Sequence, residues 1–150
     1  MVLNLRQLYG IPGEHLTIHY RIEQDAVSSG YSIVLATPIA VDGEIVNRSG
    51  IVTLSYTVQF TLDHNCDRCL CAFRRDYTFA FKHIIVRSLN QEDDEYVVSD
   101  GDSLDLDSLV LSDLLLQLPT KTLCKEDCKG LCSSCGTDLN YSDCGCKRDE

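Results

Sequence analysis

Apolar and polar residues alternate over long stretches of the first two thirds of the chain. Such alternation, together with many Val, Ile, Thr, Tyr and Phe residues, is typical of antiparallel strands. Four segments carry this signal: His15–Ile22, Ile33–Val46, Ile51–Leu62 and Phe73–Arg87. The pairs Asp42-Gly43 and Ser49-Gly50 are candidate turns. The pattern predicts a meander or a partly closed barrel.

The apolar spacing becomes helical near the acidic part of the chain. Leucine and valine residues recur there at intervals of three and four, which places them on one helix face. They are Leu106, Leu109, Val110, Leu114 and Leu118. Asp105 can cap this helix and Pro119 can end it. We expect one amphipathic helix near 106–118 that packs on the open face of the sheet.

These elements define the expected organisation. Residues 1–120 should form a β-rich domain with that helix, and residues 121–150 a cysteine-rich segment packed on it. We therefore expect an α+β fold, mainly antiparallel β, with one amphipathic helix and a C-terminal cysteine-rich tail.

Nine cysteines supply the strongest chemical signal, and none of them lies among the first 65 residues. Structural zinc is usually held by four ligands that arrive as closely spaced pairs. The chain offers four such pairs: Cys66/Cys69, Cys124/Cys128, Cys132/Cys135 and Cys144/Cys146. They can hold one or two structural Zn²⁺ ions. Cys71 is left over, and we interpret it as a small buried apolar residue.

The pairs can be combined in more than one way. Cys132/Cys135 and Cys144/Cys146 can close a site locally, which leaves Cys66/Cys69 to share an ion with Cys124/Cys128. Alternatively, the two middle pairs form one site, and the outer pairs form the other or remain empty. Spacing alone also permits an iron–sulfur cluster. A redox role for Cys66-Asp67-Arg68-Cys69 is disfavoured because the motif lies between β-rich segments rather than in a βαβ unit.

The charge is unevenly distributed. The chain has 23 acidic and 13 basic side chains, a net charge of −10, and nine of the acidic ones lie between Gln91 and Asp113. This stretch is interpreted as a solvated loop and helix start, or as an acidic surface for a basic partner such as a ribosomal protein. A local basic excess accompanies alternating aromatic residues just before it, as in some RNA-binding sheets. The candidate RNA-binding or partner-binding residues are Arg68, Arg74, Arg75, Lys82 and Arg87.

Other classes of protein are disfavoured. The N-terminus lacks a signal peptide of the usual kind, and no apolar stretch is long enough to cross a membrane. We therefore expect a reduced, cytoplasmic protein without membrane contact. The chain also lacks a phosphate-binding glycine loop, a nucleophile elbow and a metalloprotease helix. These observations favour a protein that is not an enzyme and has no small-molecule substrate.

Several of these features together resemble the bacterial YceD family, the large-subunit ribosomal RNA accumulation proteins. They are the motif Cys66-Asp67-Arg68-Cys69-Leu70, the acidic linker, the Leu-rich helix before Pro119 and the segment Cys124–Asn140. Family members commonly have proline where this chain has Ser133. The resemblance implies a non-enzymatic ribosome biogenesis factor that supports synthesis, processing or accumulation of the large-subunit (23S) ribosomal RNA. Its partners would be ribosomal RNA, a pre-ribosomal particle or a basic ribosomal protein.

A second hypothesis is kept beside the first. The protein would be a metal-responsive or redox-responsive regulator whose zinc site reports zinc or oxidant. A loosely held end at Cys144-Gly145-Cys146 could allow this.

Overall fold

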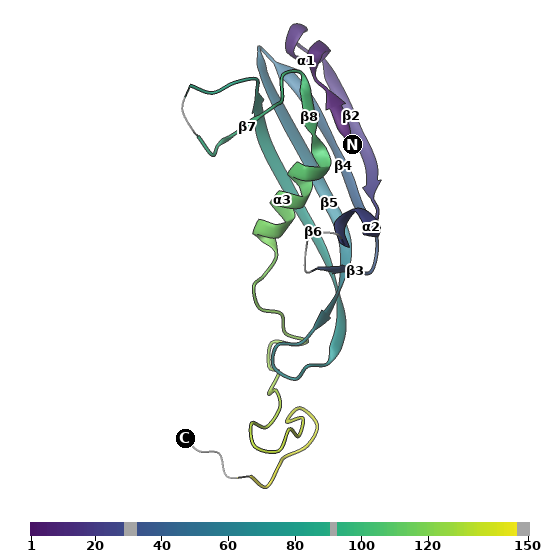
Figure 1. The fold of residues 1–150 in the computed structure, drawn as a ribbon, viewed down its shortest axis with the longest axis vertical. Coiled ribbons are helices and arrows are strands. Elements are labelled where there is room, and N and C mark those ends of the chain that lie inside the picture. Colours follow the sequence, from purple (N-terminus) through teal and green to yellow (C-terminus); the bar gives the residue numbers. More distant parts are fainter. Residues whose placement is uncertain (29–32, 91–92, 147–150) are drawn as a thin grey trace.

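The computed structural model describes residues 1–28, 33–90 and 93–146. A long sheet carries one 12-residue helix on one face, and the cysteine-rich tail extends beyond one end of the sheet (Figure 1). The elements in chain order are β1 (Val2–Asn4), α1 (Arg6–Gly10), β2 (His15–Ile22), α2 (Gln24–Ser28), β3 (Val34–Leu35), β4 (Ile39–Arg48), β5 (Ile51–Asn65), β6 (Ala72–Val86), β7 (Tyr96–Val98), β8 (Ser103–Asp105) and α3 (Leu106–Gln117). The predicted fold class, α+β with a dominant antiparallel sheet, is confirmed.

Six strands form the main sheet in the order β2-β4-β5-β6-β7, and β3 pairs with the far end of β5. All pairs are antiparallel except β6 with β7. The sheet curls into an open half-barrel (Figure 1). Its longest unit is the β5-β6 hairpin, whose register runs from Val52↔Ile85 to Asn65↔Ala72. Because β4 pairs only with the first part of β5, the end of this hairpin projects toward the tail.

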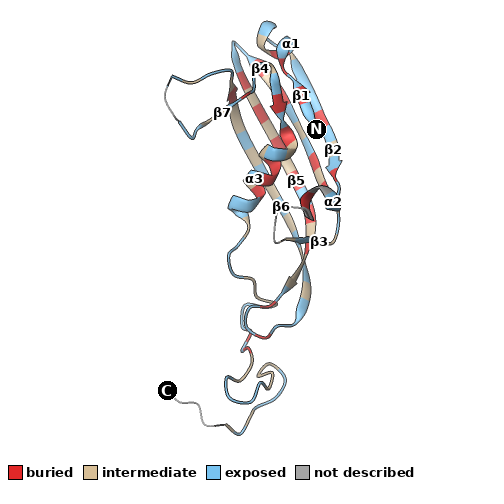
Figure 2. Cartoon of the chain, in the orientation of Figure 1, coloured by how far each residue is buried: buried red, intermediate tan, exposed pale blue. Residues whose placement is uncertain are grey.

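The core lies between the sheet and α3. Residues of β5 that point toward the helix are mostly buried, those of β6 are mostly half-buried, and Leu106, Val110, Leu111 and Leu114 are buried on the facing side of α3 (Figure 2). Asp105 caps the helix by accepting a hydrogen bond from the Ser108 N–H. The predicted packing of the Leu-rich stripe on the sheet is therefore confirmed. None of the helices in the described ranges is long and apolar enough to cross a membrane.

The structure corrects three local predictions. The segment Ile33–Val46 is two strands, because Pro38 fixes its φ and cannot donate to a strand ladder. Asp42-Gly43 lies inside β4 and is not a turn: a Cβ on Gly43 would lie 2.3 Å from the carbonyl oxygen of Ser55. Two five-residue helices, α1 and α2, were not predicted, because one helical turn is too short to show a period.

Candidate metal centre

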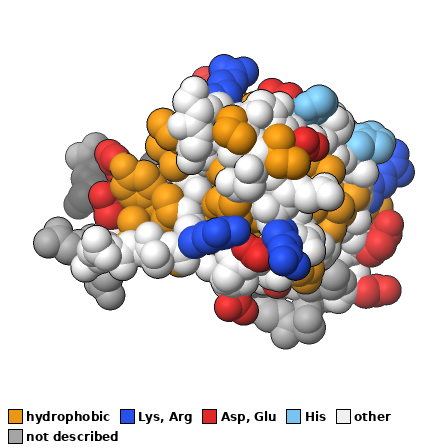
Figure 3. Space-filling view, turned by 90° about the horizontal axis from the view of Figure 1, so that it is seen from above, with side chains coloured by type: hydrophobic (Ala, Val, Ile, Leu, Met, Phe, Trp, Pro, Cys, Tyr) orange, Lys and Arg blue, Asp and Glu red, His pale blue; other side chains and the backbone are white. Residues whose placement is uncertain are grey.

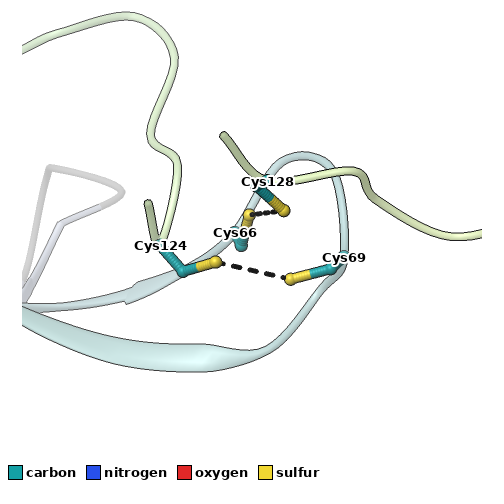
Figure 4. A group of neighbouring side chains, drawn as sticks. All are labelled: Cys66, Cys69, Cys124 and Cys128. Carbon is teal, nitrogen blue, oxygen red and sulfur yellow. Dashed lines mark hydrogen bonds between the residues drawn. The ribbon is translucent and has the colours of Figure 1, made fainter. Parts of the chain in front are cut away.

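The turn between β5 and β6 presents the first cysteine pair at the tip of the hairpin. The Leu70 N–H donates to the Cys66 carbonyl at 2.9 Å, and the Cys66 N–H donates to the Cys71 carbonyl at 2.9 Å. Leu70 adopts a left-handed backbone with φ of 61°. These two bonds close a compact turn, so that Cys66 and Cys69 direct their sulfurs toward the tail (Figure 4).

The tail completes a group of four sulfurs around this turn. The Sγ atoms of Cys66 and Cys128 are 3.7 Å apart, and those of Cys69 and Cys124 are 3.6 Å apart (Figure 4). All four sulfurs lie within 4.8 Å of one another. A tetrahedral zinc with Zn–S bonds of about 2.3 Å places its sulfurs about 3.8 Å apart. The first group therefore has the dimensions of a four-thiolate metal site.

Hydrogen bonds from the hairpin hold the tail in this position. The Arg75 guanidinium donates to the Leu123 carbonyl at 2.6 Å, and the Arg68 guanidinium donates to the Cys128 carbonyl at 2.8 Å. The Asp67 N–H donates to the Thr122 carbonyl at 2.9 Å. The tail segment that carries Cys124 and Cys128 is thus bound to the hairpin by its backbone.

A second group forms within the tail, from the pairs Cys132/Cys135 and Cys144/Cys146, and its sulfurs also lie within 4.8 Å of one another. The Gly136 N–H donates to the Cys132 carbonyl at 2.9 Å, and the Cys132 N–H donates to the Thr137 carbonyl at 2.8 Å. Gly136 is left-handed, with φ of 74°. This group is more exposed than the first. Of the two combinations that the spacing allowed, the structure has the local one.

The two turns follow the same hydrogen-bonding pattern, with Leu70 matching Gly136 and Cys71 matching Thr137. The match extends to side chains. The Thr137 hydroxyl lies 3.1 Å from the Cys135 sulfur, and the Cys71 sulfur lies 3.3 Å from the Cys69 sulfur. Cys71 is exposed, so its interpretation as a buried apolar residue is wrong. Sequence spacing could not place it, because its position depends on the shape of the turn.

Backbone N–H groups favour the thiolate at the first cysteine of each turn. Burial acts to raise the pKa of Cys66, but N–H groups of Cys69, Cys124 and Arg68 bring this pKa down to about 6. N–H groups of Cys135 and Ser134 lower the pKa of Cys132 to about 6 as well. The thiolate is the form that binds metal. The first cysteine of each turn therefore favours the metal-binding form near neutral pH, and in the second turn hydrogen bonds with Thr137 also lower the pKa of Cys135.

The five basic candidate residues do not form one surface. Arg68 and Arg75 bind the tail, as described above. Arg87 lies over the Tyr9 ring, 4.3 Å from its centroid, and pairs with Asp102 at 2.7 Å. Arg74 and Lys82 point to the opposite face of β6, the face without α3, and both are exposed.

The aromatic residues of β6 lie on the α3 side of the sheet. Phe79 pairs with buried Val58, and Phe81 pairs with buried Tyr56. Tyr77 and Phe79 are partly buried against the core. Of the five candidate basic residues, Arg75 contacts this row of aromatic rings: its guanidinium lies over the Phe73 ring, 5.2 Å from the ring centroid. The expected surface of mixed aromatic and basic side chains is therefore limited to that pair.

Two basic residues that the sequence reasoning missed lie on the same face as Lys82. Arg21 and Arg48 are exposed on β2 and β4. Arg48 and Lys82 line a hollow of about 140 Å³ together with Glu44, Val46, Thr53 and Ser55. The sequence could have placed them, because apolar residues that become buried alternate with outward positions along β2 and β4, and Arg21 and Arg48 occupy outward positions.

The acidic stretch is partly used by the fold itself. Glu92 lies outside the described residues. Asp102 pairs with Arg87, Asp105 caps α3, and Asp107 accepts a hydrogen bond from the Tyr20 hydroxyl. Asp113 accepts hydrogen bonds from Tyr56 and lies 2.6 Å from the His83 ring nitrogen. These four carboxylates therefore have partners within the chain.

Comparisons with known proteins identify the family of the chain. Residues 54–150, which include all nine cysteines, match the family described as "Large ribosomal RNA subunit accumulation protein YceD". An uncharacterized protein of Mycobacterium leprae is 31% identical over 108 residues, which is 68% of this chain. The chain spans about half the length of that relative, 49%. No solved structure matches at a significant level. Because the family match covers more than half of the chain, the protein belongs to the YceD family of large ribosomal RNA subunit accumulation proteins.

Proposed function

We propose that this protein is a non-enzymatic ribosome biogenesis factor of the cytoplasm that supports accumulation of large-subunit (23S) ribosomal RNA by binding that RNA or a precursor particle. The family match carries this proposal, since it includes the hairpin tip, α3 and both cysteine groups. The geometry of the cysteine groups agrees with it, because all-cysteine metal sites are normally closed and structural rather than catalytic.

We further propose one structural zinc ion in each cysteine group. The sulfur separations, the N–H groups that favour thiolates and the matching turns all support this assignment. In the first group the ion would join the hairpin tip to the tail, since Cys66 and Cys69 come from the hairpin and Cys124 and Cys128 from the tail. In the second group it would fold the tail on itself.

Elemental analysis of the purified chain tests the zinc assignment. The expected content is one ion for each of the two groups. A Cys66→Ser, Cys69→Ser variant and a Cys132→Ser, Cys135→Ser variant should each lose one ion and keep the other. A folded wild-type protein without bound metal, or with iron in place of zinc, would overturn the assignment.

The proposed RNA contact is the face of the sheet that α3 does not cover. Its outward positions on β2, β4, β5 and β6 carry as many basic as acidic side chains, although the chain as a whole is strongly acidic. The basic ones are Arg21, Arg48, Arg74 and Lys82, and the acidic ones are Asp42, Glu44, Asp63 and Asp76. Figure 3 looks onto the end of the molecule opposite the cysteine groups, where basic and acidic side chains are interspersed. Phosphate binding draws on exposed Lys and Arg, so the uncovered face is the favoured contact.

Filter binding of the purified chain to transcribed large-subunit RNA, at several salt concentrations, tests this surface. The variant Arg48→Ala, Lys82→Ala should bind more weakly, and its log–log salt slope should fall by about 0.7 to 0.9 for each lost phosphate contact. Arg6→Ala, Lys121→Ala removes the same charge from exposed residues elsewhere and is the matched control. Equal binding by both variants would exclude this face. A wild-type chain that binds no RNA but joins precursor particles would indicate a ribosomal protein as partner.

A further inference from the structure

A fifth sulfur, that of Cys71, lies beside the first cysteine group but is not one of its four members. Cys71 is exposed, and its Sγ lies 3.3 Å from that of Cys69. Cys69 is buried and also lies 3.6 Å from Cys124 inside the group. Cys69 therefore stands between the proposed metal ligands and a thiol that solvent can reach.

The second group shows what this arrangement would be without the extra sulfur. Its turn has the same backbone hydrogen bonds, but the position of Cys71 is occupied by Thr137. A hydroxyl can donate a hydrogen bond to a metal-bound sulfur as a thiol can, but it cannot form a disulfide with that sulfur. The two groups thus differ at one position beside a candidate ligand. Cys71 can form a disulfide with Cys69, whereas Thr137 cannot form one with Cys135.

We propose that Cys69 and Cys71 form an oxidation site at which a peroxide makes a disulfide, removes Cys69 from the metal and releases the ion of the first group. The inference rests on the proposed zinc binding. It assigns the sensitivity to the hairpin tip, not to the Cys144-Gly145-Cys146 end. Leu70, between the two cysteines, is 67% exposed, so a small oxidant has access to the turn.

The chemistry balances with hydrogen peroxide as the oxidant. Cys71 loses its proton and attacks one peroxide oxygen as the thiolate, the O–O bond breaks, and Cys71 becomes a sulfenic acid while the leaving hydroxide takes up the proton and forms water. The Cys69 thiolate then attacks the Cys71 sulfur, an S–S bond forms and hydroxide leaves. The two sulfurs together lose two electrons, which the peroxide gains. Zinc is not reduced; it dissociates because one of its four thiolates has become a disulfide sulfur.

The structure indicates what this release would change. Cys124 and Cys128 come from the tail, and the backbone on either side of them is bound by Arg75 and Arg68. Loss of the ion would leave hydrogen bonds as the attachment of the tail to the hairpin tip: the two from these arginines and the backbone bonds of Asp67 with Thr122 and of Leu131 with Arg68. Oxidation would therefore loosen the tail at its root and leave the second group intact.

The test uses the zinc-loaded full chain, hydrogen peroxide and a chromogenic zinc chelator. Wild-type protein should release one ion quickly and keep the other, and peptide mass mapping should find a Cys69–Cys71 disulfide that thiol reductant reverses. Cys71→Thr copies the second turn and retains a donor. It should slow the fast release by about tenfold or more, because the sulfenic intermediate cannot form. Thr137→Cys should make the second ion sensitive as well.

The outcomes separate this inference from the zinc proposal. Metal content is measured before peroxide is added, so an ion-free wild-type chain would refute zinc binding itself. With zinc present, equal release rates in wild type and Cys71→Thr would overturn the oxidation site. Zinc loss without the mapped disulfide would overturn it too. Should Cys71→Thr fold poorly, the gain of sensitivity in Thr137→Cys decides the question.

Discussion

Arg74 and Arg75 are neighbours in sequence that should behave in opposite ways when each is changed to alanine. Arg75 points to the α3 side of the hairpin, donates to the Leu123 carbonyl at 2.6 Å and lies over the Phe73 ring. Arg74 points to the other face, where its side chain is 71% exposed and pairs with Asp63 at 2.6 Å. We expect Arg75→Ala to loosen the tail and Arg74→Ala to leave it in place.

The contacts set the size of the difference. A hydrogen bond from a charged donor contributes about 1.5 to 3 kcal/mol. A cation–π contact contributes about 0.5 to 1 kcal/mol at a partly exposed site. Because Arg75 is only half-buried, we expect a loss near the lower end of their sum, about 2 kcal/mol. The exposed Arg74–Asp63 pair contributes about 0 to 1 kcal/mol.

Limited trypsin digestion of the zinc-loaded protein measures tail opening, since Lys121 and Lys125 lie exposed beside the first cysteine group. A loss of about 2 kcal/mol raises the open population roughly 30-fold, and cleavage at these lysines should accelerate accordingly for Arg75→Ala. Cleavage of Arg74→Ala should stay close to wild type, while its RNA affinity should fall. Equal cleavage of the two variants would refute the assignment of Arg75 to the tail.

Three further predictions concern Gly43, Tyr56 and the proposed metal. Gly43→Ala would place a Cβ 2.3 Å from the Ser55 carbonyl oxygen and should cost about 3 kcal/mol in urea unfolding, whereas Gly10→Ala, with open space around it, should stay within about 1 kcal/mol. Burial and the hydrogen bond to Asp113 raise the pKa of Tyr56, so its stabilising contribution is present below about pH 10 and is lost at higher pH. Tyr56→Phe should accordingly show a weaker fall in unfolding free energy between about pH 10 and pH 11. Chelation of the metal should remove the ordered structure of the tail and leave the circular dichroism of the sheet nearly unchanged.

Much of the fold could be predicted, because alternation and helical spacing are local signals. β5, β6 and α3 lie within a few residues of their expected positions. Gly43 was misread because Asp-Gly is a turn signal in isolation, while its actual role depends on Tyr56, its partner on the neighbouring strand. Such cross-strand contacts are set by register, which one strand does not reveal alone.

The candidate site shows the same division. Closely spaced cysteine pairs predict a metal site. The short gap between Cys135 and Cys144 favours one site formed by the last two pairs within the tail. The roles of Arg68 and Arg75 could not be predicted, because they depend on where the tail runs after α3. The alternation of β6 already places neighbouring arginines on opposite faces, so the expected single basic surface overlooked a signal that was present.

The buried residues form two separate clusters, and the cysteines belong to the smaller one. The main core includes residues of the sheet and helices as far as Leu118, but none from the tail. A separate small cluster joins Cys66, Cys69 and Cys128 with a few neighbours, chiefly Phe73, Leu123 and Leu131. A cluster of this size buries too little apolar surface to order a segment of the tail's length, and chains this short usually need a metal or a disulfide. The sheet folds by hydrophobic burial, whereas the proposed metal sites would order the tail, so a change at Cys69 would alter the tail without disturbing the face proposed to bind RNA.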